Sequence, residues 1–218
     1  MIDVSKKKRI VLKLGTSTLT HKTGKLNIRR MTNLVRILSD LHNEGRELLL
    51  VSSGAVGMGV GKLNLSERPK DTPSKQAAAA VGQCELMHIY DDMFAKYNVT
   101  VAQILLTRAT LTNERLPHVQ NTIGRLLEMG VIPIVNENDT VAIDELELEI
   151  GENDSLSATV AAAVGADLLV ILSDINGLYS ADPRTNADAQ VIREVHKIDE
   201  HIEQMAGCLL YTSPSPRD

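Results

Sequence analysis

The chain has 218 residues, 43% of them hydrophobic, which is enough to bury the core of one large domain or two small ones. One Phe, four Tyr and no Trp leave little for the aromatic stacking that single-strand nucleic-acid binders use, and a formal net charge of −5 does not suit a polyanion partner. The composition therefore argues against a disordered or fibrous chain and against nucleic acid as a partner.

The cysteines and the N-terminal residues indicate the compartment. Cys84 and Cys208 lack the spacing of a zinc site or of a disulfide framework, which fits a reducing cytoplasm. The apolar run 10–14 is interrupted by Lys13 and is far shorter than a signal or membrane segment. We therefore expect a cytoplasmic protein with no metal site of its own and no membrane partner.

Strand and helix patterns alternate along most of the chain. Short apolar runs bounded by turn residues predict strands at 9–14, 48–51, 99–106, 131–135 and 168–172. Apolar residues at helical spacing predict helices from the capping residue Asn27 to Gly45, and at 75–97, 113–129 and 156–164. A turn at 15–17 ends the first strand, the glycine-rich segment 52–61 starts a further helix, and 66–74, with two prolines, forms a surface loop.

This alternation predicts an α/β protein, a three-layer α/β/α sandwich with a mainly parallel central sheet. One segment departs from the pattern, because apolar and acidic residues alternate over 145–150 with the period of a half-buried strand. With 141–143 as the outgoing arm and a turn at 144–145, it predicts an antiparallel β-hairpin that protrudes from the sheet.

Polar residues flank this hairpin on both sides, at 136–139 and 152–154. The hairpin base would bring the two clusters together beyond the carboxyl end of strand 131–135, where open α/β sheets bind ligands. Asn153, Asp154 or Ser155 would cap the next helix and aim its N-terminus at the same place. The alternative is a solvated hairpin with ordinary Asn/Asp turns.

Other segments favour an anionic ligand. Lys13, inside an apolar strand, must either reach an edge or meet an anion. The segment 52–61 fits neither the P-loop nor the dinucleotide fingerprint, so its Ser-Ser-Gly turn suits either an anion or close helix–strand packing through glycine. Residues 173–184 form either a loop near a nucleotide or an ordinary connection. No hydrolase or metalloprotease motif is present, and the set fits a small-molecule kinase.

Seven motifs carry a resemblance to a known family: VLKLGTS at 11–17, VSSGAVGMG at 51–59, SKQAAAAVGQ at 74–83, QILLTR at 103–108, IPIVNENDTV at 132–141, GENDSLSA at 151–158 and SDINGLYSADPR at 173–184. Over about 9–207 the chain resembles the amino acid kinase family. It is most similar to the members that use ATP to phosphorylate the side-chain carboxylate of L-glutamate, giving L-glutamyl 5-phosphate in the first step of proline biosynthesis.

The resemblance implies a role for each matching residue. Lys13 and Asp154 would be catalytic, with Lys13 on the phosphates and Asp154 organising the charges. L-Glutamate would be bound by Ser53, Asn136, Asp139 and Asn153. ATP would be bound by Lys13, Ser173 and Asp174, with Mg²⁺ carried mainly by the nucleotide. The family also implies a homo-oligomer, a dimer or a tetramer.

The chain departs from the family at its end. We expect a kinase domain over 1–207, comprising the glutamate-binding part and the start of the nucleotide-binding part, and a disordered or artefactual tail over 208–218. The family continues into a glycine-rich segment whose lysine is a second phosphate contact, so we expect this chain to bind ATP weakly and to turn over poorly or not at all. The alternatives are a kinase of aspartate or N-acetylglutamate, or a non-catalytic amino-acid-binding regulatory domain.

Overall fold

The computed structural model describes residues 3, 6–21, 25–112, 114–141, 153–173, 175–200 and 202–205. They fall into a larger compact unit, Asp3–Leu172, and a smaller one that begins at Ser173. Over these residues no helix combines the length and the apolar character needed to cross a membrane. The tail predicted at 208–218 lies outside the described residues.

Five parallel strands form the sheet of the larger unit, in the order β3-β4-β2-β1-β5. Their bounds are β1 Arg9–Leu14, β2 Glu47–Ser52, β3 Val101–Leu106, β4 Ile132–Glu137 and β5 Leu168–Leu172. The five strands predicted from the sequence are thus confirmed, and the apolar runs are nearly continuous because both faces of the sheet are covered. The strand β4 extends to Glu137, so it includes the first two residues of a predicted polar cluster.

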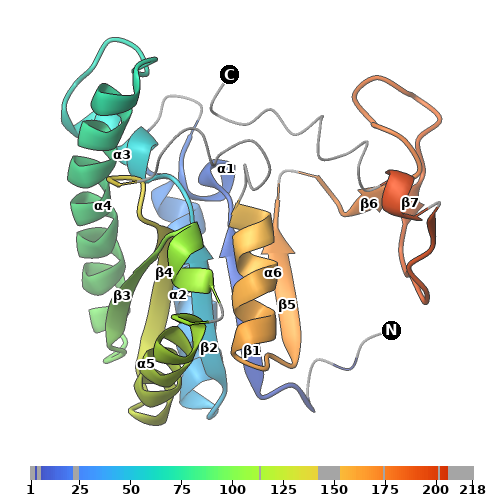
Figure 1. Cartoon of the computed structure of the whole chain (residues 1–218), viewed down its shortest axis with the longest axis horizontal. Coiled ribbons are helices and arrows are strands. Elements are labelled where there is room, and N and C mark those ends of the chain that lie inside the picture. Colours follow the sequence, from blue (N-terminus) through green and yellow to red (C-terminus); the bar gives the residue numbers. More distant parts are fainter. Residues whose placement is uncertain are drawn as a thin grey trace. The chain divides into compact units, whose positions relative to one another are not determined.

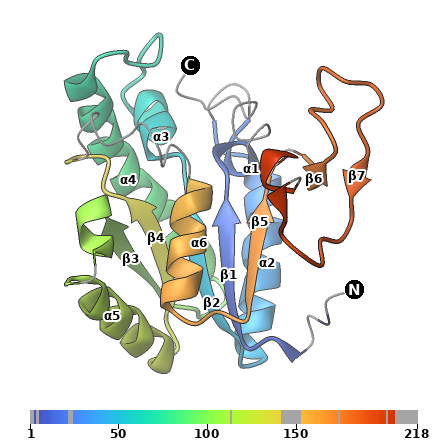
Figure 2. The same cartoon turned by 45° about the vertical axis from the view of Figure 1, so that its right-hand side comes forward.

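Helices lie on both faces of this sheet (Figure 1). Their bounds are α1 Thr16–Leu19, α2 Ile28–Asn43, α3 Ala55–Lys62, α4 Thr72–Ala95, α5 Leu116–Glu128 and α6 Asn153–Ala163, with a 3-10 helix, η2, at Arg108–Leu111. Leu12 and Leu50 belong to the core cluster under α2 and α4, whereas their neighbours Val11 and Leu49 belong to the cluster under α5 and α6. This alternation confirms the three-layer α/β/α architecture, and Figure 2 shows α6 in front of the strands.

The start of α4 corrects one prediction. The Asp71 carboxylate accepts a hydrogen bond from the Ser74 backbone N–H at 2.9 Å, so Asp71 caps the helix. Pro73 fits the first turn, because a backbone N–H has no helical partner there. The helix therefore begins inside the segment 66–74 that was predicted to be a loop.

Two further predicted boundaries are wrong. The helix α6 begins at Asn153, so Asn153 and Asp154 occupy its first turn instead of capping it, and residues 16–19 form a short helix where only a turn was expected. The predicted hairpin lies outside the described residues except for Val141, which is in a turn.

The smaller unit contains two antiparallel strands that the sequence did not predict, β6 Leu178–Tyr179 and β7 Val191–Ile192. Each is two residues long, which is too short for a period of two to appear in the sequence. The strand β6 lies within residues 173–184, the segment predicted to be either a loop near a nucleotide or an ordinary connection.

Glycines in α3 and α4 allow the two helices to touch through their backbones. A Cβ atom on Gly59 would lie 1.8 Å from the Ala78 carbonyl oxygen, and one on Gly82 would lie 1.8 Å from the Ala55 carbonyl oxygen. Neither distance is compatible with a side chain. Within the segment 52–61, Gly59 therefore serves close packing through glycine, as in one of the two alternatives, although its partner is another helix instead of a strand.

We predict that Gly82→Ala lowers the melting temperature, because the new methyl group must push α3 away from α4. Overpacking of this kind costs about 3 kcal/mol, which corresponds to roughly 6–12 °C in a domain of this size. Thermal unfolding followed by circular dichroism measures the effect. The control is Gly61→Ala in α3, where a Cβ atom meets nothing within 4 Å, so that melting should be unchanged or slightly higher. Equal melting of Gly82→Ala and the parent chain would contradict the packing argument.

Charged residues join the amino ends of three strands. Arg9 Nε donates to Glu47 Oε2 at 2.7 Å, and Arg9 Nη1 donates to the Val164 carbonyl oxygen at 2.5 Å. The Asp167 carboxylate accepts hydrogen bonds from the backbone N–H groups of Arg9 at 2.8 Å and Lys8 at 3.0 Å. The Arg9 hydrogen bond holds the pKa of Glu47 below its usual value, and the Arg9 backbone N–H does the same for the pKa of Asp167.

These lowered pKa values predict how stability depends on pH. Both carboxyl groups bind protons more readily in the unfolded chain, so their stabilisation is complete above the unfolded pKa of about 4 and is lost as the pH falls through the lower folded pKa. Replacing Glu47 with Gln should flatten the fall in urea midpoint between about pH 5 and pH 3. An unchanged acid profile for Glu47→Gln would show that the Arg9 contact does not stabilise the fold.

Candidate active site

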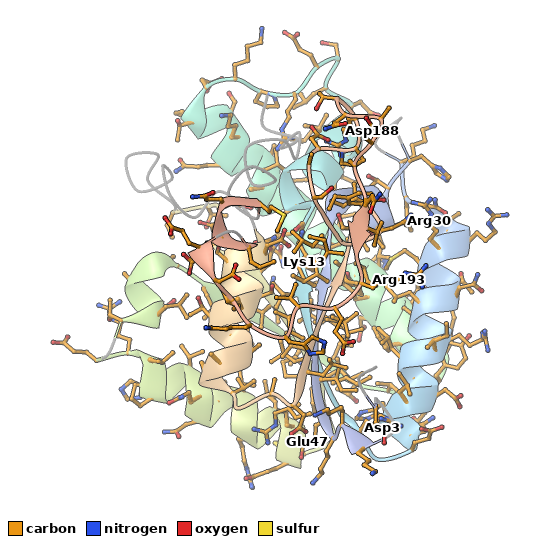
Figure 3. The ribbon with its side chains drawn as sticks, turned by 90° about the vertical axis from the view of Figure 1, so that its right-hand side faces the viewer. Asp3, Lys13, Arg30, Glu47, Asp188 and Arg193 are labelled. Atoms are coloured by element: carbon orange, nitrogen blue, oxygen red, sulfur yellow. The ribbon has the colours of Figure 1, made fainter. Side chains whose placement is uncertain are left out.

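Lys13 lies in the middle of the sheet and near its carboxyl edge. It is the residue before the last one of β1, and its neighbours in the register are Val51 of β2 and Ile171 of β5. Figure 3 shows it toward the opposite end of the sheet from Glu47. Lys13 is 9% exposed, and its Nζ lies 2.6 Å from Asp154 Oδ1. Of the two alternatives for this lysine, the structure shows contact with an anionic group, here a carboxylate of the chain itself.

Asp154 holds its carboxylate in the first turn of α6, where the exposed backbone N–H groups favour negative charge. The Ser157 hydroxyl donates to the Asp154 carbonyl oxygen at 2.6 Å and closes this turn. The Asp154 side chain is 31% exposed, against 11% for Lys13, so the ion pair is accessible from the Asp154 side. The pair avoids the cost of a buried unpaired ammonium, and Lys13 keeps two further N–H donors for an approaching anion.

The side chain of Asn153 joins α6 to the end of β2. Its Nδ2 donates to the Ser52 carbonyl oxygen at 2.9 Å and to Ser53 Oγ at 2.5 Å. The same nitrogen lies 3.4 Å from Asn136 Oδ1, at the end of β4. One residue from each predicted polar cluster, Asn136 and Asn153, therefore meets the other at the carboxyl edge of the sheet.

A glycine turn sets the direction in which the chain leaves β2. The Ser53 backbone N–H donates to the Leu14 carbonyl oxygen at 3.1 Å, which continues the pairing of β2 with β1. Gly54 then has φ = +102°, a left-handed conformation that residues with a side chain rarely adopt. The chain enters α3 at the next residue, Ala55, so the Ser53 hydroxyl lies just before the N-terminus of a helix.

Asn136 is almost fully buried and uses both ends of its amide. Its Nδ2 donates to Gln83 Oε1 at 2.8 Å, and its Oδ1 accepts from the Glu137 backbone N–H at 2.9 Å. Gln83 projects from α4 and is 7% exposed. Gln83 was not among the site residues predicted from the sequence.

A second buried contact from α4 supports the end of β2. The Tyr90 hydroxyl lies 2.9 Å from Ser52 Oγ, both side chains are fully buried, and burial raises the pKa of Tyr90 above its usual value. Neither residue was selected from the sequence either. The available signal was the position of Gln83 and Tyr90 at helical spacing from the apolar residues Ala79, Leu86 and Phe94, which predicts polar groups on the buried face of a helix.

Three further residues were predicted for the site: Asp139, Ser173 and Asp174. Asp139 is half-buried in the turn after β4, which is closed by a hydrogen bond from the Val141 backbone N–H to the Asn138 carbonyl oxygen at 3.1 Å. Ser173 is exposed and begins the smaller unit, and Asp174 lies outside the described residues. Across the described part of the chain, no group of three or more His, Cys, Asp and Glu side chains is arranged to hold a metal ion.

The contacts of Asn153 predict the result of a substitution by the shape-matched acid. In Asn153→Asp a carboxylate would face the Ser52 carbonyl oxygen and Asn136 Oδ1, which only accept, so unfolding should require about 2 kcal/mol less. The control is Asn138→Asp, where the side-chain oxygen already accepts from Thr140 Oγ1 and a carboxylate can replace it. Urea unfolding of the two variants measures the difference, and equal midpoints would contradict the donor role of Asn153.

Comparison with known proteins identifies the family. The family model described as the amino acid kinase family matches residues 8–208. The glutamate 5-kinase of Clostridium perfringens is 55% identical over 203 residues, which cover 92% of this chain and 76% of that relative. The chain belongs to the amino acid kinase family, among its glutamate 5-kinases.

Another relative and two solved structures differ more from this chain in length or in sequence. The glutamate 5-kinase of Moorella thermoacetica is 53% identical over 207 residues, which cover 94% of this chain and 54% of that relative. The UMP kinase of Ureaplasma parvum is a solved structure with a TM-score of 0.58, 14% identity and coverage of 93% of this chain and 86% of that one. The UMP kinase of Bacillus anthracis has a TM-score of 0.56 at 17% identity. These structures show that the amino acid kinase fold is shared.

Proposed function

We propose that the chain transfers the γ-phosphoryl group of ATP to the side-chain carboxylate of L-glutamate, giving L-glutamyl 5-phosphate and ADP. The observation that carries the proposal is the Lys13–Asp154 pair at 2.6 Å, placed beside a hydrogen-bonded set of Asn153, Ser53 and Asn136. It combines a cation for phosphates with polar groups for an amino acid. The names of the relatives supply the identity of the acceptor.

The chemistry needs charge stabilisation more than proton transfer. A glutamate side chain is already ionised at neutral pH, so one of its oxygens attacks the γ-phosphorus without a general base. A bond from that oxygen to phosphorus forms, the bond from phosphorus to the oxygen bridging the β- and γ-phosphates breaks, and ADP leaves with the electron pair. Negative charge spreads over the transferring group, which is the charge that a fixed cation stabilises.

Lys13 is the group that we assign to this charge. Its ammonium would approach the phosphates from the carboxyl end of the sheet. The low solvent exposure of Lys13 would strengthen the attraction between the ammonium and the phosphates. Asp154 would hold the Lys13 ammonium in one position through the existing ion pair. We call Lys13 catalytic and give Asp154 the role of organising the charges.

The acceptor side would be built on Ser53, Asn153, Asp139 and Asn136. Because Asn153 Nδ2 donates to the end of β2, Asn153 would meet glutamate through its oxygen, which suits the α-ammonium group. The Asp139 carboxylate suits the same group. The Ser53 hydroxyl, already an acceptor from Asn153, has its own proton to donate to a carboxylate oxygen.

The assignment of the ATP-binding residues is supported by the family resemblance. Lys13, Ser173 and Asp174 would contact ATP, and Mg²⁺ would arrive mainly on the nucleotide phosphates, since this ion prefers phosphate and water oxygens to an all-protein cage. The same resemblance supports a homo-oligomer and a cytoplasmic, biosynthetic role. ATP supplies the phosphoryl group and Mg²⁺ neutralises part of its charge.

Acceptor choice tests the proposal directly. ADP release in the presence of Mg-ATP should be faster with L-glutamate than with L-aspartate or N-acetylglutamate, and calorimetry should show the same order of binding. Faster ADP release with L-aspartate or N-acetylglutamate would show that glutamate is not the preferred acceptor. Glutamate binding that is the same in calorimetry with and without Mg-ATP would favour a regulatory binding domain instead of a kinase.

The role of Lys13 predicts a separate outcome for each substrate. Lys13→Met keeps the length of the side chain and removes its charge, so ADP release should fall at least about 10²-fold, as for loss of a group that stabilises transition-state charge. The glutamate dissociation constant should stay within about threefold, because the acceptor residues are untouched. Wild-type turnover by Lys13→Met would remove Lys13 from the mechanism.

A further inference from the structure

The buried side chain of Gln83 contacts the proposed glutamate site, but the proposed function gives it no role. Gln83 comes from the middle of α4, is 7% exposed, and presents Oε1 to Asn136 Nδ2 at 2.8 Å. Asn136 is 2% exposed and in turn lies 3.4 Å from the Asn153 amide nitrogen. A chain of three side-chain amides therefore runs from α4 across the end of β4 to the first turn of α6.

Backbone groups fix the direction of this chain at both ends. The Glu137 backbone N–H can only donate, so the side-chain atom of Asn136 that faces it must be the oxygen. The Asn136 nitrogen then faces Gln83, so the Gln83 atom that accepts its hydrogen bond must be the oxygen. At the other end the Ser52 carbonyl can only accept, so the Asn153 atom that faces it must be the nitrogen. The oxygen of Asn136 and the nitrogen of Asn153 therefore face each other as acceptor and donor.

We propose that Gln83 is a positioning residue of the glutamate site, acting through the buried Asn136 amide to hold Asn153 in its binding orientation. This inference rests on the proposed function. With its nitrogen satisfied by Gln83, Asn136 keeps its oxygen toward Asn153. Without that acceptor, the Asn136 nitrogen would be buried and unpaired, a state that favours rotation of the amide toward another acceptor. A rotated Asn136 would set its nitrogen against the nitrogen of Asn153.

The consequence reaches the substrate through Asn153 and Ser53. Asn153 Nδ2 donates to Ser53 Oγ at 2.5 Å and to the Ser52 carbonyl oxygen at 2.9 Å. A displaced Asn153 amide would therefore move two of the proposed glutamate contacts, Asn153 itself and Ser53. Water cannot easily replace Gln83, since Gln83 and Asn136 are both more than nine-tenths buried. The Gln83 nitrogen makes no hydrogen bond within the described residues, so the acceptor oxygen is the atom that carries the role.

Two substitutions of Gln83 separate this role from simple packing. Gln83→Met keeps the size of the side chain and removes the acceptor. Gln83→Glu keeps an oxygen that can accept from Asn136 in either protonation state, and it sacrifices no hydrogen bond of the described structure. Calorimetric titration with L-glutamate should show at least about tenfold weaker binding by Gln83→Met, and binding within about threefold of the parent chain by Gln83→Glu.

A core variant of the same helix is the control for lost stability. Leu86→Ala removes a fully buried side chain of α4 that takes no part in the amide chain, so it should lower the melting temperature while leaving the glutamate dissociation constant within about threefold. Parent-like binding by Gln83→Met would overturn the inference. Binding by Gln83→Glu as weak as that of Gln83→Met would overturn it as well, since the acceptor would then not be the relevant group.

A measurement without substrate separates this inference from the proposed function. The side-chain amide signals of Asn153 in a ¹⁵N–¹H correlation spectrum should shift in Gln83→Met and stay near their positions in Gln83→Glu and Leu86→Ala. If the parent chain fails to bind glutamate, the proposed function fails, and the Asn153 signals still decide whether Gln83 orients the amide chain. Unshifted Asn153 signals in Gln83→Met would refute the positioning role in either case.

Discussion

The ion pair between Lys13 and Asp154 is the constraint on which the arrangement of the site depends. A lysine within a covered parallel strand requires an anionic partner, because an unpaired ammonium at 9% exposure would be costly. The first turn of α6 supplies that partner at 2.6 Å, which fixes where the helix starts relative to β1. Once α6 is held there, its first residue, Asn153, necessarily faces the ends of β2 and β4. One charged contact thus positions the neighbouring polar groups.

The second constraint is that the amide side chains around Asn153 are oriented by backbone atoms. The Ser52 carbonyl and the Glu137 N–H belong to the last residues of two neighbouring strands, so their positions are set by the sheet itself. Side chains that take their orientation from strand ends cannot easily adapt to a ligand, and a site built in this way is organised before the ligand arrives. Such preorganisation is the property that electrostatic catalysis requires.

Much of the fold could be predicted, because the determining signals are local in the sequence. The apolar runs of β1 and β5 are bounded by turn residues and gave the observed strand ends. Helix starts were harder, since the beginning of α4 depends on an Asp71 cap and a tolerated Pro73, and that of α6 on tertiary contacts of Asn153. Helical spacing could place Gln83 on the buried face of α4, but its contact with Asn136 could not be predicted, because the two residues are 53 apart and only the folded sheet brings them together.

The glycines of 52–61 were ambiguous in the sequence because glycine serves two different structural needs. A turn with positive φ and a close backbone contact both require residues without a side chain, and this segment contains both kinds of position. Gly54 is needed for its positive φ beside Ser53, whereas Gly59 is needed because a Cβ atom would overlap Ala78 of α4. The contact between α3 and α4 thereby links the turn that carries Ser53 to the helix that carries Gln83. Helix packing and the geometry of the proposed acceptor site therefore both depend on α4, which lies outside the conspicuous polar motifs.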